Sequence, residues 1–106
     1  MDNFTTIYTI LKRLEKAMDY DEFDMDCISA QQLKISENRL MKIWEMLCKA
    51  GYVDGISVKY GVQGDFVVSV NNPRITLKGI EYLNDNSFMK KAANLAKGIK
   101  DAIPGI

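Results

Sequence analysis

The chain has 106 residues, of which 47% are hydrophobic and 26% charged, the composition of one ordinary globular domain. Its 14 basic and 14 acidic side chains cancel, so the bulk charge gives no support for a nucleic-acid partner. No apolar run reaches the roughly 18 residues that a membrane helix needs, and Cys27 and Cys48 lie among apolar residues, as free thiols do in a reducing compartment. We therefore expect a single domain over residues 1–106, in the cytoplasm and without a membrane partner.

Apolar residues recur at helical spacing over residues 3–18 and predict an amphipathic helix, capped by Asp2 or Asn3. The opposite face is mostly charged, which is typical of a helix that covers a core. The predicted buried stripe consists of Phe4, Ile7, Tyr8, Leu11, Leu14 and Met18.

The stretch from Asp19 to Asp26 alternates acidic with apolar residues. It lacks the glycine and the final glutamate that a calcium-binding loop needs at its sixth and twelfth positions, so we predict no metal site there. We interpret it as a solvated linker from which Tyr20, Phe23 and Met25 reach the core.

Two helices separated by a tight turn are predicted next. Ser29 followed by Gln32 is a capping-box pattern that opens a short helix ending near Leu33. The turn follows at Lys34, where many helix-turn-helix units have glycine, so we expect strain or a longer turn there. Ser36 then caps a longer helix that ends at Gly51 and buries one row of apolar residues, namely Leu40, Ile43, Trp44 and Leu47.

Alternating residues at 56–60 and 66–70 predict two strands joined by the glycine-containing loop 61–65. Pro73 is expected to close the second strand, because proline cannot donate to a central ladder. Thr76 is predicted to cap a helix that ends at a break over residues 84–87. Gly79 within that helix predicts close packing against another backbone, and its predicted inward residues are Leu77, Ile80 and Leu83.

A last helix is predicted over residues 87–102, because apolar and small residues follow one another there at steps of four and three. Four lysines give this segment a basic character. We predict that Phe88, Leu95 and Ile99 contact either the rest of the same chain or a second copy in a homodimer. Binding to a membrane surface through the lysines is a third interpretation.

The order of these elements predicts an α+β fold, a winged helix-turn-helix with a two-strand wing and additional C-terminal helices. A further short strand is expected between the first two helices. Proteins of this kind place the outer face of the second helix of the helix-turn-helix in the major groove of DNA.

The candidate DNA contacts lie on that outer face and on the wing. Asn38 is of a type that reads adenine, and Arg39 or Lys42 of a type that reads guanine or binds phosphate. Glu45, in the middle of the face, would repel phosphate, and an ordinary solvated helix face is the alternative interpretation. The predicted DNA-binding residues are Ser36, Asn38, Arg39, Lys42, Lys49, Lys59, Gln63 and Arg74.

The chain resembles the YjcQ family of small bacterial and prophage-associated proteins over essentially its whole length. The similarity is most distinctive in the first helix and in the segments 72–83 (NPRITLKGIEYL) and 89–100 (MKKAANLAKGIK). The resemblance implies a winged-helix fold, and it brings no catalytic residue or ligand. Any role in DNA binding then follows from the fold alone.

We therefore expect a DNA-binding regulator of phage or prophage origin that carries out no catalysis. The alternative is a winged-helix module that binds another protein and not DNA. Histidine, a G-x-S-x-G sequence and a P-loop are all missing from the sequence, so we predict that the chain is not an enzyme and has no catalytic residues, metal site or cofactor.

Overall fold

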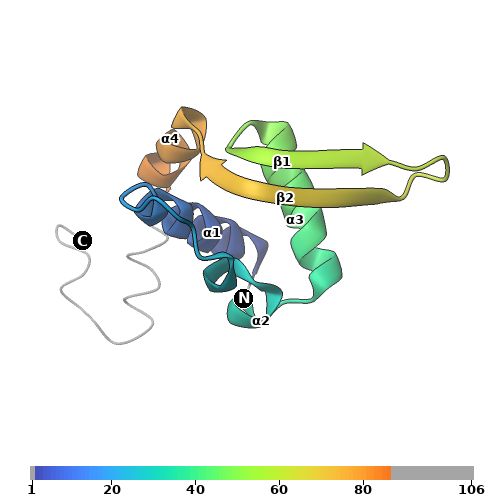
Figure 1. Cartoon of the computed structure of the whole chain (residues 1–106), viewed down its shortest axis with the longest axis horizontal. Coiled ribbons are helices and arrows are strands. Elements are labelled where there is room, and N and C mark those ends of the chain that lie inside the picture. The colour runs from blue at the N-terminus through green and yellow to red at the C-terminus, as the bar shows by residue number, and fades with distance from the viewer. Residues whose placement is uncertain (1, 87–106) are drawn as a thin grey trace.

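The computed structural model describes residues 2–86, which form an α+β domain with helices packed against a two-strand antiparallel sheet (Figure 1). The predicted α+β class is confirmed over this range. The predicted helix 87–102, with Phe88, Leu95 and Ile99, lies outside the described residues. The elements are α1 (Asn3–Ala17), the 3-10 helix η1 (Met25–Ile28), α2 (Ala30–Leu33), α3 (Glu37–Ala50), β1 (Val53–Tyr60), β2 (Phe66–Ile75) and α4 (Leu77–Asp85).

The α-helices begin where a short polar side chain accepts a backbone hydrogen bond, as predicted for α1, α2, α3 and α4. Asp2 Oδ1 accepts from the Thr5 N–H at 2.7 Å, and this bond holds the pKa of Asp2 below its ordinary value. The contribution of this cap to stability is therefore present above the ordinary pKa and is lost as the pH falls through the lowered value. Helix α3 ends at Gly51, which adopts φ +80° as a left-handed cap.

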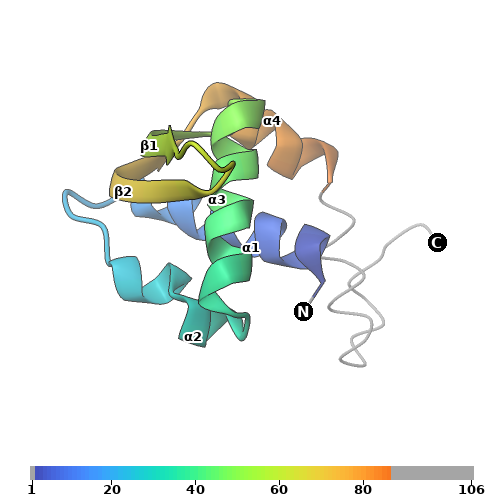
Figure 2. The same ribbon diagram turned by 90° about the vertical axis from the view of Figure 1, so that its right-hand side faces the viewer.

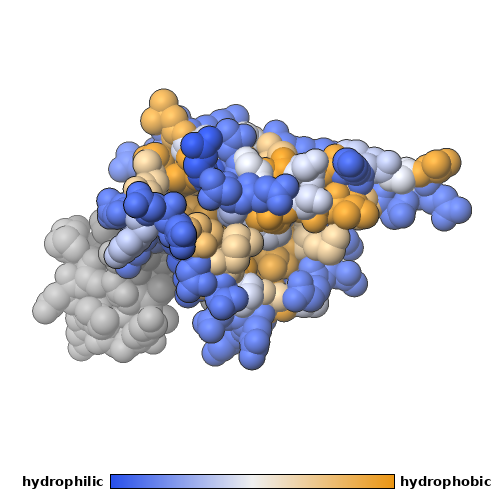
Figure 3. Space-filling model, viewed as in Figure 1, coloured by the Kyte–Doolittle hydropathy of each residue, from blue (hydrophilic) through white to orange (hydrophobic). Residues whose placement is uncertain are grey.

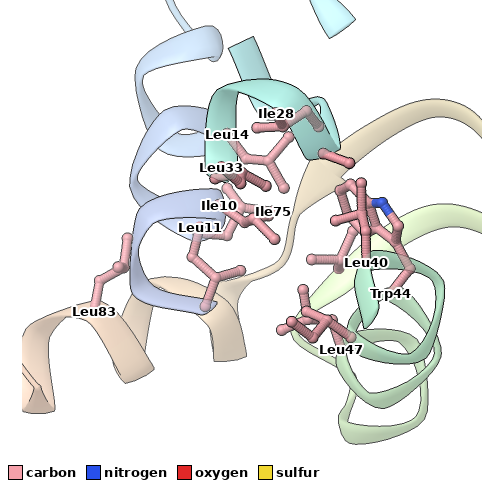
Figure 4. Packing of buried hydrophobic residues seen from close by; sticks show 13 residues of the cluster. Ile10, Leu11, Leu14, Ile28, Leu33, Leu40, Trp44, Leu47, Ile75 and Leu83 are labelled. Carbon is pink, nitrogen blue, oxygen red and sulfur yellow. The ribbon is translucent and has the colours of Figure 1, made fainter. Parts of the chain in front are cut away.

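The core lies between α1, α3 and the short segment that joins them. Figure 4 shows Leu14 and Ile10 of α1 directed toward Leu33, with Trp44 of α3 on the far side of the cluster. Leu33 is fully buried although α2 has only four residues. Since a single turn of helix is unstable alone, its tertiary contacts hold α2 in place.

Several predicted core residues are exposed, and those predictions were wrong. The buried stripe of α1 is displaced toward Thr6 and Ile10, because the elements packed on α1 cover neither the first residue of the predicted stripe nor its last, which follows the end of the helix. Leu77 lies in the first turn of α4, where the buried Gly79 faces inward instead. The linker after α1 runs over the surface and only Phe23 packs on the core. The exposed residues are Phe4, Met18, Tyr20, Met25 and Leu77.

The hairpin is longer than predicted, and Pro73 lies within β2 instead of closing it. Each strand of a two-strand sheet has a free edge, so proline is tolerated. The register shifts between Asp54 and Ile56, where Gly55 adopts φ +80° and Asn72 adopts φ +53°. A Cβ at Gly55 would lie 2.5 Å from the Asn72 carbonyl oxygen, so this bulge requires glycine. The short strand predicted between α1 and α2 was wrong, because η1 occupies that place.

The strain predicted at Lys34 is confirmed, because this residue adopts φ +57° and ψ +43° at the end of α2. A non-glycine residue in this conformation costs about 1–2 kcal/mol. Glycine removes this strain, but it also increases the conformational entropy of the unfolded chain, which offsets part of the gain in stability.

We expect Lys34→Gly to raise the free energy of unfolding by about 0.5–1 kcal/mol, measured by urea denaturation. Exposed Lys16→Gly, within α1, is the control and should be destabilising. A loss of stability in Lys34→Gly would contradict the expectation.

Helix α3 lies across the hairpin, whose loop extends away from the helices (Figures 1 and 2). Helices α2 and α3 meet at the tight turn of Lys34 and Ile35, and the hairpin follows α3 directly. This arrangement is compatible with a winged helix. Within residues 2–86, none of the helices is both long and apolar enough to cross a membrane.

Candidate functional site

The outer face of α3 borders a hollow of about 590 Å³, between the start of α1 and the start of β2. Asn38, Arg39 and Lys42 line this hollow from the first half of α3, and they lie on the exposed side of the helix. Glu45 and Met46 line it from the second half. Ser36 lines it at the start of the helix, so the hollow gathers four of the predicted DNA contacts on one surface, together with the acidic Glu45.

The N-terminal end of α3 is fixed by two polar contacts. Ser36 Oγ accepts from the Arg39 N–H at 3.1 Å, and Arg39 Nη1 donates to Asn3 Oδ1 at 2.9 Å. Asn3 belongs to α1, so Arg39 connects the starts of two helices that are far apart in the sequence. Asn3 was considered in the sequence only as a possible cap, because no local pattern relates residues 36 positions apart.

Glu45 is engaged by the hairpin. Its carboxylate accepts a hydrogen bond from the Tyr60 hydroxyl at 2.7 Å and lies 3.9 Å from Lys49 Nζ. The Glu45 side chain is only 18% exposed. The sequence did not indicate that Tyr60 pairs with Glu45, because the helical pattern of α3 does not show which strand residue will cover its acid. The one acidic side chain lining this hollow, among the described residues, is thus partly shielded and paired.

Lys49 is held in the same cluster. Its Nζ lies 5.2 Å from the centre of the Tyr60 ring, a cation–π distance. Contact with Tyr60, and then the charge of Glu45, raise the pKa of Lys49, so this side chain stays protonated at neutral pH. Its position supports the junction of α3 with the hairpin, and it is less available for a DNA contact than Lys42.

The two faces of the hairpin carry different side chains, aromatic on one face and basic on the other. Tyr60 pairs with Phe66 on the face toward α3, with ring centres 6.1 Å apart. Lys59 is one residue away in β1, so it projects from the opposite face. Gln63 lies in the exposed loop beside Val62, which is fully exposed, and apolar surface is visible at the hairpin tip in Figure 3.

Arg74 does not join this surface. It pairs in register with Asp54 at the far end of the hairpin, and it borders a separate hollow of about 700 Å³ with Met18 and Tyr20. Along β2 it lies roughly 27 Å from Phe66, at about 3.4 Å per residue. The structure therefore brings Ser36, Asn38, Arg39 and Lys42 together, places Lys59 and Gln63 on the projecting hairpin, and separates Arg74 from both.

The comparison with known families gives one finding. The family model described as YjcQ protein matches residues 8–102, most of the chain. The chain belongs to the YjcQ family. The resemblance to this family that the sequence indicated is thereby confirmed. Neither a curated protein nor a solved structure matches the chain.

The described part of this YjcQ family member shows no arrangement of three or more His, Cys, Asp or Glu side chains suited to a metal ion. Burial raises the pKa of the Cys27 thiol, and the nearby Arg13 opposes this effect to a smaller extent. Arg13 also donates a hydrogen bond to the Cys27 carbonyl oxygen. A thiol in this environment stays protonated at neutral pH, so it is not an activated nucleophile.

Proposed function

We propose that this YjcQ family member is a DNA-binding winged-helix regulator of phage or prophage origin. In this role α3 enters the major groove through its first half, and the hairpin acts as the wing along the DNA backbone. No catalytic step is involved.

The observation that carries the proposal is the pairing of Glu45 with Tyr60 and Lys49. An unpaired carboxylate in the middle of α3 would repel phosphate and oppose docking in a groove. Held by a hydroxyl donor and a cation, Glu45 leaves Asn38, Arg39 and Lys42 as the groups of the first half of α3 that face the hollow. These are an amide and two cations, the types that read base edges and bind phosphate.

The start of α3 is also suited to an anion. Backbone N–H groups at a helix N-terminus attract phosphate, and the Ser36 hydroxyl can donate to phosphate while its oxygen caps the helix. The hydrogen bond from Arg39 to Asn3 uses one of the five guanidinium donors and leaves the others for guanine or phosphate. In this role Lys59 and Gln63 of the projecting hairpin would contact the DNA backbone.

We expect the full chain to retard random double-stranded fragments at low salt and micromolar protein, in a mobility-shift assay. Affinity should rise steeply as salt falls, because phosphate binding releases counterions. The Arg39→Ala/Lys42→Ala double variant should reduce the slope of log K against log salt by about 2, because each cation on a phosphate contributes roughly 0.9 to that slope.

The matched control is Lys16→Ala/Lys78→Ala, which removes two exposed positive charges from α1 and α4. This variant should keep most of the slope, since bulk charge is altered equally while the α3 face is untouched. Absence of retardation at micromolar protein, or an equal loss in both double variants, would contradict direct binding through α3.

A protein-binding module is the second candidate, and the apolar part of the same hollow favours it. Met46 is 46% exposed there, beside the half-buried Phe66. The zero net charge of the whole chain also suits a protein partner better than DNA. Under this alternative Met46→Ala weakens partner capture, while no salt-dependent DNA retardation is seen with the unmodified chain.

A further inference from the structure

A second surface lies between α1 and α4, and it includes no residue of α3 or of the hairpin. It is a groove of about 740 Å³ with an apolar base formed by Tyr8, Ile80 and Leu83. Phe4 precedes Tyr8 by one helical turn and is 67% exposed. The apolar side of the groove therefore continues along α1 toward its start, with an aromatic side chain that nothing in the described range covers.

The rim of the groove is acidic. Glu81 and Asp85 border it from α4, and Glu15 borders it from α1. Lys12 Nζ lies 2.9 Å from Glu15 Oε1, so these two charges neutralise each other. The negative charge of the rim therefore comes from the two carboxylates of α4. An occupant of this groove needs an apolar stripe with cations beside it.

The chain itself contains such a segment immediately after α4. Residues 88–99 present Phe88, Leu95 and Ile99 at helical steps, with lysines at 90, 91 and 97 between them. Helix α4 ends at Asp85, which itself lines the groove, so the segment starts at the groove's edge. From Phe88 to Ile99 a helix would extend about 16 Å, at 1.5 Å per residue, and the stripe from Phe4 to Glu15 has the same length.

We propose that residues 88–99 occupy the α1–α4 groove of their own chain, with the apolar stripe on Tyr8 and Ile80 and Lys91, which flanks this stripe, toward Glu81 and Asp85. A segment tethered directly to α4 has an effective local concentration of the order of millimolar, which favours the same chain over a second copy. This docking is independent of DNA binding, because none of its residues lies on α3 or the hairpin.

Photo-crosslinking of the full chain tests the docking. With p-benzoylphenylalanine in place of Phe88 or Leu95, we expect a cross-link within one chain, at monomer mass, to peptides containing residues 4–15 or 80–85. The same group in place of Lys97, which lies on the other side of the predicted helix, is the control and should reach these peptides several-fold less.

A cross-linked dimer would overturn the assignment in favour of a second copy, and cross-links outside α1 and α4 would overturn it altogether. The charge contribution is tested by Glu81→Lys/Asp85→Lys, which should reduce the intrachain yield several-fold. Asp54→Lys/Asp65→Lys makes the same charge change on the hairpin, away from the groove, and should leave the yield unchanged. Equal yields in both double variants would show that the acidic rim plays no part in recognition.

Discussion

Replacing Leu33 with alanine is expected to lower the free energy of unfolding by about 2–5 kcal/mol, the range for a fully buried leucine. Leu33 has no exposed surface and holds the four-residue helix α2 against Ile10 and Leu14 (Figure 4). Its truncation removes apolar packing and leaves a cavity between α1 and α2. Since about 1 kcal/mol moves the melting temperature of a domain this size by roughly 4–8 °C, the loss is measurable by calorimetry.

The matched control is Leu77→Ala. Sequence periodicity predicted this leucine to point inward, whereas its side chain is 73% exposed at the start of α4. Its truncation should change the free energy of unfolding by no more than about 0.5 kcal/mol. Equal losses at Leu33 and Leu77 would contradict the packing around α2. The packing of Leu33 also matters for the candidate site, because the turn after Leu33 sets the direction in which α3 leaves α2.

Gly79→Ala is expected to destabilise the protein by about 1–3 kcal/mol, through overpacking. Helix propensity predicts the opposite, a gain of about 1 kcal/mol for alanine over glycine within α4. The tertiary contact at Gly79 decides whether the substitution stabilises or destabilises the protein. A Cβ at Gly79 would lie 2.4 Å from the Tyr52 carbonyl oxygen and 2.7 Å from Ile75 Cγ1. Tyr52 O also accepts from the Thr76 N–H, so the obstructing backbone is itself fixed.

Urea denaturation of Gly79→Ala beside Glu81→Ala separates the two effects. Glu81 is exposed in the same helix, so its replacement should stay within about 0.5 kcal/mol of the parent. A more stable Gly79→Ala protein would mean that α4 is not pressed against the Tyr52 backbone. Loss of stability only at Gly79 supports the close approach that fixes α4 beside the start of β1.

Local patterns in the sequence determined where most elements begin and end. Short polar caps and positive-φ positions act within a few residues, so Ser36 and Gly51 predicted the limits of α3. The inner row of α3 was also predictable, because a helix with one apolar side has only one side to bury. The strain at Lys34 was predictable for the same local reason, because a lysine occupies a turn position that requires a left-handed backbone conformation.

Tertiary structure alone decided which predicted apolar residues are covered and which predicted site residues share a surface. Periodicity gives an apolar side of a helix but not how much of that side another element reaches, so Phe4 and Leu77 were misplaced. Arg74 and Lys42 are equally basic in the sequence, yet the length of β2 separates Arg74 from the α3 face. Glu45 appeared as an obstacle to phosphate in the sequence, and only the fold of the hairpin back over α3 supplies the Tyr60 hydroxyl that pairs with it.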